Sequence, residues 1–134
     1  MTAVKKIVFP FIFILGFLLV STAAKSQIEI PNDIIKSLEK GNAKLLSDYF
    51  NDNVELVVLD NDNVYSKAQA KQIVKNFFDS FVPESFTIIH RGGKEGSKYV
   101  IGNLKTNNGN FRIYFLLKKE KGKDYIHQLR IEKK

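Results

Sequence analysis

The stretch SKAQAKQIVKNFFDSF, residues 66–81, has the strongest helical pattern in the chain. Its apolar residues recur three and four positions apart, which places them on one side of a helix. Ser66 and Gln69 have the spacing of a capping box, which satisfies free N–H groups at a helix start. Pro83 then ends the helix. The predicted apolar stripe consists of Ala70, Ile73, Val74, Phe77, Phe78 and Phe81.

After Pro83 the pattern changes to four runs in which apolar and polar residues alternate. The runs cover residues 85–91, 98–106, 111–119 and 125–132, and the segments between them are rich in turn-forming residues. Alternation with a period of two is typical of strands, and short turns join neighbouring strands directly. The second half of the chain therefore predicts an antiparallel meander of four strands.

The first half predicts two short helices and one strand. IPNDIIKSLEKGN carries start and stop signals of a helix, AKLLSDYF places its apolar residues on one face, and VELVVL is a β-branched strand followed by the turn cluster DNDN. The resulting order is helix, helix, strand, helix and four strands. This order predicts an α+β fold with about three helices on one face of a curved antiparallel sheet of about five strands.

The N-terminus has the three parts of a secretory signal in order. MTAVKK is basic, residues 7–20 are an unbroken apolar run, and STAAKSQ is rich in small residues. We expect cleavage after Ala24 or Ser26, which makes residues 1–26 a signal peptide and 27–134 one exported domain, periplasmic or secreted. The alternative is an uncleaved anchor, but the run is shorter than the roughly 20 residues of a membrane span. No stable membrane anchor is expected after cleavage.

Composition narrows the kind of site to expect. The chain has no cysteine, which excludes disulfides and thiolate zinc sites from its support. Its net charge of +7 falls to +4 without the signal, and residues 27–85 hold 6 basic and 10 acidic side chains while 86–134 hold 12 and 4. The lysines at 67, 71 and 75 are read as a solvated helix face, and those at 118–123 as a solvated turn, so nucleic acid is not an expected partner.

Four blocks of the sequence resemble a bacterial family of small exported proteins of unknown function. They are GNAKLLSDYFNDNVEL, YSKAQAKQIVKNFF, YVIGNLKTNNGNFRIYFLLKK and IHQLRIE, and the similarity covers residues 28–132. The family is placed in the nuclear transport factor 2-like superfamily, which implies a cystatin-like cone of curved sheet wrapped by helices. That superfamily includes isomerases, dehydratases and binding or dimerisation modules, and the family gives no catalytic residues to carry over.

The glycine-rich segment HRGGKEGSKY, residues 90–99, raises the question of an anion site. A phosphate loop needs glycines that run into a helix N-terminus, and here strands are expected on both sides. The glycines are therefore read as a hairpin turn. No cofactor or metal is predicted, and no catalytic residue is assigned.

Two histidines and two tyrosines are the candidate ligand-binding residues. His90 alternates with Phe86 and Ile88, and His127 alternates with Leu129 and Ile131, so both are expected on the core side of their strands. With Tyr49 and Tyr125 they could border a cavity for a small apolar or amphipathic ligand. The alternative interpretation is that both histidines are packing residues.

The outer face of the meander is the candidate dimer surface. In FRIYFLLK, one face is apolar and the other mixes apolar and charged residues, a composition that suits a contact between two copies. Members of the superfamily often pair through this surface, and the alternative is a partly covered surface of a monomer. The residues assigned to it are Val100, Leu104, Tyr114, Leu116, Ile126 and Arg130.

Together these features predict a non-catalytic module that binds a small ligand or another protein. The alternative function is a small-molecule isomerase or lyase with His90 or His127 as the general base. The state of the cone's interior separates the two. A cavity with a titratable group and a nearby donor favours catalysis, and an interior filled by phenylalanine favours an interaction module.

Overall fold

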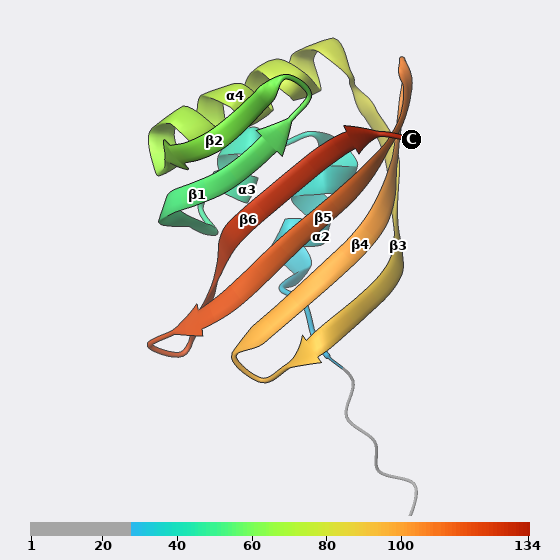
Figure 1. Cartoon of the computed structure of the whole chain (residues 1–134). Coiled ribbons are helices and arrows are strands. Elements are labelled where there is room, and N and C mark those ends of the chain that lie inside the picture. The colour runs from blue at the N-terminus through green and yellow to red at the C-terminus, as the bar shows by residue number, and fades with distance from the viewer. Residues whose placement is uncertain (1–27) are drawn as a thin grey trace, which may run out of the picture.

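The computed structural model describes residues 28–134, and the predicted signal segment lies outside them. The described elements are helices α2 (Asn32–Lys40), α3 (Ala43–Ser47) and α4 (Lys67–Ser80), and strands β1 (Phe50–Val58), β2 (Asn61–Ser66), β3 (Pro83–Lys94), β4 (Ser97–Thr106), β5 (Gly109–Glu120) and β6 (Lys123–Lys133). Figure 1 shows one curved sheet with the helices gathered on one side of it. The predicted α+β fold is therefore confirmed. No helix within residues 28–134 is long and apolar enough to cross a membrane.

The sheet has six strands in the order β2-β1-β6-β5-β4-β3. Neighbouring strands are antiparallel except β1 and β6, which are parallel. The expected turn at residues 60–63 is wrong in part, because the chain turns at Leu59 and Asp60 and Asn61 already begins β2. Leu59 has a φ of 55°, the left-handed conformation that a tight turn requires. The polar composition of β2 hid it from a search for apolar strands.

Helix α4 forms as its sequence predicts. The Ser66 side chain accepts a hydrogen bond from the Gln69 backbone N–H at 3.2 Å, and the Gln69 side chain accepts one from the Ser66 N–H at 3.0 Å. This is the reciprocal capping box, and it fixes the first turn of the helix. Within the predicted stripe Ala70, Val74, Phe77 and Phe78 are buried, and Ile73 and Phe81 pack against them as partly buried residues.

The interior between α4 and the sheet is filled by aromatic rings. The centroid of Phe111 lies 5.0 Å from that of Phe77 and 4.9 Å from that of Phe81, both in edge-to-face geometry. Phe50 and Phe115 add two more rings that are at most 1% exposed. Burial of each such ring stabilises the fold by about 2 kcal/mol. The space between α4 and the sheet is thus occupied by phenylalanine.

Candidate functional site

The register between β4 and β5 decides which residues form the outer face of the sheet. Val100 lies opposite Phe115, and Leu104 lies opposite Phe111. Directly opposed residues point to the same face, so Val100 and Leu104 share the core side with these two rings, and both are 0% exposed. Their assignment to a dimer face was therefore wrong. Both faces of β4 carry apolar residues, so its own sequence does not reveal which face is buried.

A β-bulge in β6 changes which of its residues face the core. Leu116 pairs with Gln128, but the next residue, Leu117, pairs with Ile126, so β6 carries one extra residue at this point. An extra residue reverses the alternation of faces. Ile126 and Leu129 consequently both point into the core, and placing Ile126 on the outer face was wrong. Arg130, opposite Tyr114, does lie on the outer face and is exposed.

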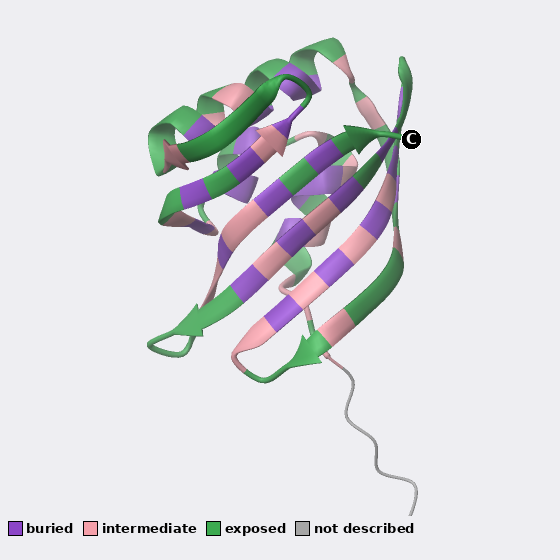
Figure 2. Cartoon of the chain, viewed as in Figure 1, coloured by how far each residue is buried: buried purple, intermediate pink, exposed green. Residues whose placement is uncertain are grey.

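Four bulky side chains meet at the centre of the outer face, and we call them the outer patch. Tyr99 lies opposite Leu116, and Ile101 lies opposite Tyr114, so the four form two adjacent cross-strand pairs on β4 and β5. All four are half-buried. In Figure 2, buried positions alternate with these half-buried ones along the central strands. The described helices pack on the other side of the sheet (Figure 1), which leaves the patch uncovered.

His90 lies on the outer face, beside the patch. The pairing of β3 with β4 shifts by one residue between Ile88 and His90, which turns His90 away from the core and sets it opposite Ile101. Its Nε2 is 3.1 Å from the Tyr99 hydroxyl, and the two rings are 5.6 Å apart. The Tyr99 ring is in turn 6.2 Å from that of Tyr114. The expectation that His90 faces the core was wrong.

Gly92 permits the position of the Tyr99 ring. A Cβ atom at Gly92 would lie 2.5 Å from the Tyr99 hydroxyl oxygen and 2.6 Å from its ring carbon Cζ, so the phenol rests directly on the β3 backbone. The glycine therefore serves close packing on the outer face. The Tyr99 ring is held between β3 and Tyr114, which gives the outer patch a defined shape.

His127 lies at the bulge of β6, away from His90. Its Nε2 is 3.1 Å from Glu120 Oε2, at ion-pair distance but at an angle that does not make a hydrogen bond. Strands β5 and β4 lie between β6 and β3 in the sheet, so the structure does not bring the two histidines together. Neither histidine lines either of the hollows described below. Within residues 28–134 no group of three or more acidic, histidine or cysteine side chains is arranged to hold a metal ion.

The two candidate tyrosines both lie near the ammonium group of Lys123. Lys123 Nζ lies 6.0 Å from the ring centroid of Tyr49 and 5.5 Å from that of Tyr125. The Tyr49 hydroxyl also donates a long hydrogen bond of 3.4 Å to Asp33 Oδ2. Burial is the largest cause that raises the pKa of Tyr49 above its usual value. The negative charge of Asp33 and the hydrogen bond to its carboxylate raise this pKa further. Both rings therefore lie near an exposed cation of the chain itself.

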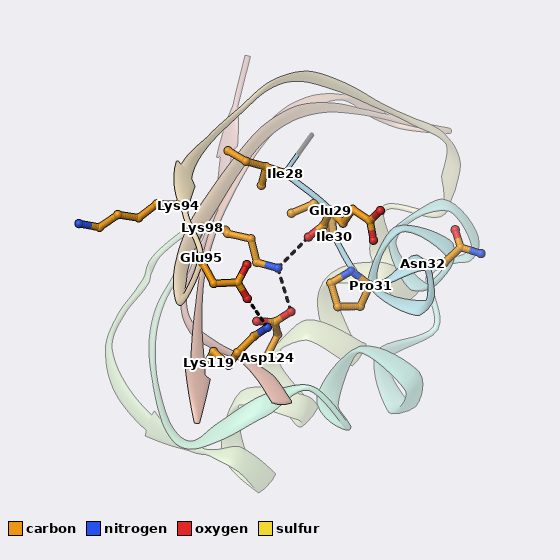
Figure 3. Close-up of a pocket in the computed structure, with 10 residues that line it drawn as sticks. All are labelled: Ile28, Glu29, Ile30, Pro31, Asn32, Lys94, Glu95, Lys98, Lys119 and Asp124. Carbon is orange, nitrogen blue, oxygen red and sulfur yellow. Dashed lines mark hydrogen bonds and ion pairs between the residues drawn. The ribbon is translucent and has the colours of Figure 1, made fainter. Parts of the chain in front are cut away.

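The larger hollow, about 880 Å³, lies between the segment that precedes α2 and the ends of two hairpins. Figure 3 shows the residues that line it: Ile28, Glu29, Ile30, Pro31, Asn32, Lys94, Glu95, Lys98, Lys119 and Asp124. We call residues 28–31 the strap. In the figure the side chain of Lys94 points away from the other charged groups.

Most charges of this hollow are paired with one another. Lys98 Nζ lies 3.1 Å from Asp124 Oδ2 and donates a 2.8 Å hydrogen bond to the carbonyl of Glu29. Lys119 Nζ is 2.7 Å from Glu95 Oε2. This network joins the strap to the turns of both hairpins. Sequence reasoning missed it by reading residues 90–99 as a plain hairpin turn and the lysines at 118–123 as a solvated turn, since only the fold brings these segments together.

Comparison with known proteins identifies the chain's family. The model of DUF4783, a domain of unknown function, matches residues 31–132. The chain belongs to the DUF4783 family. A solved DUF4783 protein from Bacteroides ovatus is similar at 37% identity and a TM-score of 0.75, over 79% of this chain and 96% of that one. No curated protein matches the chain.

More distant structures share the fold alone. A protein named as an NTF2, Rd1NTF2, has 17% identity and a TM-score of 0.61 over 75% of this chain and 90% of that one. A domain of unknown function with a cystatin-like fold from Nostoc punctiforme has 9% identity and a TM-score of 0.60 over 77% and 72%. The DUF4783 fold of this chain is thus NTF2-like, as its sequence blocks indicated.

Proposed function

We propose that this DUF4783 protein is an exported, non-catalytic interaction module that forms a homodimer through the outer patch. The observation that carries the proposal is the contiguous pairing of Tyr99 with Leu116 and of Ile101 with Tyr114 on the uncovered face. Half-exposed aromatic and aliphatic side chains in one cluster are typical of an interaction surface. The phenylalanine rings between α4 and the sheet support the same interpretation, because they leave little room for a substrate in that part of the interior.

Charges around the outer patch suit a second copy of the same chain. Glu55 and Glu132 flank it together with Arg112, Lys118 and Arg130, so both signs are present on the face. A face of one sign would repel its copy, whereas a mixed face can pair with itself across a twofold axis. Strands β1 and β3 lie equally far from β5. A twofold axis parallel to β5 would set β1 of one copy opposite β3 of the other.

The two histidines that the catalytic alternative needs as general bases do not lie in a pocket. The alternative with His90 or His127 as the general base needs one of these histidines inside a pocket, with a donor placed for the developing charge. His90 is exposed on the outer face, and His127 lies beside Glu120 outside both hollows. We therefore retain the interaction module as the function to test.

Sedimentation equilibrium of residues 27–134 at micromolar concentration tests the proposal. We expect a dimer for the unchanged domain and a monomer for Ile101→Glu and Leu116→Glu, which place a carboxylate inside the patch. Val82→Asp is the control, since Val82 is 47% exposed and lies between α4 and β3, outside the patch. A monomeric unchanged domain, or dimers that persist in both patch variants, would contradict it.

Export is tested separately by the mass of the mature protein. When the full chain is expressed in a Gram-negative host, we expect the periplasmic fraction to contain a protein that begins at Lys25 or Gln27. This follows from the order of basic, apolar and small residues in the first 26 positions. A full-length protein retained in the membrane fraction would support the uncleaved anchor instead.

A further inference from the structure

A second hollow, of about 570 Å³, lies on the helical side of the molecule. It is formed by the turn between α2 and α3 together with the outer side of α4. We call it the basic hollow, because four of the eight side chains that line it are lysines and one is acidic. The residues are Lys40, Gly41, Asn42, Ala43, Lys44, Lys71, Lys75 and Asp79.

The basic hollow is positively charged, although the half of the chain that forms it is acidic overall. Residues 27–85 carry 6 basic and 10 acidic side chains. Four of those six lysines line the hollow, together with only one of the ten acids. The sequence placed Lys71 and Lys75 on a solvated helix face. The fold adds Lys40 and Lys44 from two other helices, so positive charge is concentrated at one concave place.

Two of the four lysines have no carboxylate partner. Lys75 lies 3.0 Å from Asp79 and Lys44 lies 3.6 Å from Asp48, and all four of these side chains are more than half exposed. Such exposed pairs exchange readily with a stronger anion. Within residues 28–134, Lys40 and Lys71 form no ion pair. Their charge is available to a ligand.

The turn that carries Lys40 and Lys44 is firmly seated against the rest of the fold. Gly41 has a φ of 69°, and a Cβ atom there would lie 2.8 Å from Cδ of Pro83 and 3.5 Å from the Phe78 ring. Asn42 caps α3 by accepting a 3.0 Å hydrogen bond from the Leu45 N–H. The backbone on one side of the hollow is therefore held at a fixed distance from α4 on the other.

We propose that the basic hollow binds a phosphate group, either of a free small molecule or of a lipid headgroup. Phosphate is compact and multiply charged, and lysine ammonium groups bind it as point charges. The net charge of the lining side chains matches a polyanion better than a single carboxylate. The hollow lies on the side of the sheet opposite the outer patch, so this inference is independent of dimer formation.

Isothermal titration calorimetry with inorganic pyrophosphate at low salt tests the site. The decisive variant is Lys71→Gln, which removes a charge without leaving an unpaired carboxylate behind. The matched control is Lys67→Gln, on the same helix and in the same lysine row but outside the hollow. We expect Lys71→Gln to weaken binding about fivefold, the value of one charge pair at contact distance in a watery site. We expect Lys67→Gln to change it less than about twofold at the same net charge, because screening limits the reach of exposed charges.

Asp79→Asn provides a second readout with the opposite sign. It removes the one carboxylate of the hollow and frees Lys75, so we expect tighter binding of pyrophosphate. Equal weakening by Lys71→Gln and Lys67→Gln would show that only the overall charge acts, and no effect of Asp79→Asn would show that the anion does not bind beside Asp79. Either result would overturn the site.

Co-sedimentation with vesicles separates the two sources of phosphate. Binding to phosphatidylglycerol but not phosphatidylcholine vesicles, lost in Lys71→Gln and kept in Lys67→Gln, would assign the hollow to lipid headgroups. Binding of pyrophosphate alone, with the same pattern of variants, would assign it to a free ligand. Absence of binding to both probes would overturn the proposal.

Discussion

The ammonium group of Lys98 lies 3.1 Å from the carboxylate of Asp124, with the two side chains only 10% and 12% exposed. The pair connects the beginnings of β4 and β6, which are not neighbours in the sheet. Lys98 also donates to the carbonyl of Glu29, and Arg91 Nη1 donates a 3.3 Å hydrogen bond to that of Ile28. Lys98, held by Asp124, and Arg91 thus fix the strap to the sheet.

Lys98→Met is expected to lower the free energy of unfolding by about 3 kcal/mol, because it leaves the Asp124 carboxylate buried without its partner. Urea denaturation measures the change. Lys105→Met, an exposed lysine on the same strand, is the control and is expected to change stability by less than about 0.5 kcal/mol. In the double variant Lys98→Met/Asp124→Leu much of the loss should return. If Lys98→Met and Lys105→Met changed stability equally, a structural role for the Lys98–Asp124 pair would be contradicted.

Gly102→Ala is expected to destabilise the core by about 1–3 kcal/mol through overpacking. A Cβ atom at Gly102 would overlap the ring of Phe86 and would lie 2.9 Å from the backbone oxygen of Thr87. Thermal unfolding of the variant measures the loss. Adding Phe86→Leu should recover part of it, since the smaller side chain makes room, and a purely additive double variant would speak against this contact.

Lys119→Gln is expected to return the pKa of Glu95 towards its ordinary value. The hydrogen bond from Lys119, followed by its positive charge, lowers that pKa in the folded protein. Because the pKa of Glu95 is lower in the folded protein than in the unfolded chain, its carboxylate stabilises the fold at neutral pH. This contribution is lost as the pH falls through the folded-state pKa. The contribution is small because the carboxyl group is exposed. Carboxyl NMR titration measures the shift, and Lys118→Gln should leave it unchanged.

Tyr49 is expected to ionise at higher pH than an ordinary tyrosine. Its folded-state pKa is raised from 10.0 by burial and by Asp33. The stability that this shift contributes is fully present below the pKa of Tyr49 in the unfolded chain. It is lost as the pH rises through the pKa of Tyr49 in the folded protein. Tyr49→Phe should therefore lose less stability than the unchanged domain between about pH 8 and about pH 11. Ultraviolet titration of phenolate checks the assignment, with Tyr125→Phe as the control.

The elements that sequence predicted well are those with local causes. The capping box at Ser66 and the apolar stripe that follows it define α4 within one continuous segment. The alternation after Pro83 likewise locates all four strands of the meander. These signals depend on residues within a few positions of one another, and the neighbouring elements do not change them.

The faces of the strands were harder to predict, because a single extra residue reverses them. The bulge in β3 turned His90 outwards, and the bulge in β6 turned Ile126 inwards. Neither position contains a glycine or proline that would announce it. The hollows depend on contacts such as that of Lys98 with Asp124, 26 residues apart, which only the completed sheet brings together. The candidate sites were therefore predicted less well than the fold.

Isotope-filtered NOE spectroscopy on a mixture of labelled and unlabelled residues 27–134 tests the dimer most directly. The account predicts intermolecular contacts between the rings of Tyr99 and Tyr114 in one copy and the methyl groups of Ile101 and Leu116 in the other. It also predicts their loss in Ile101→Glu. Intermolecular contacts confined to the helices, or none at a concentration well above micromolar, would contradict it.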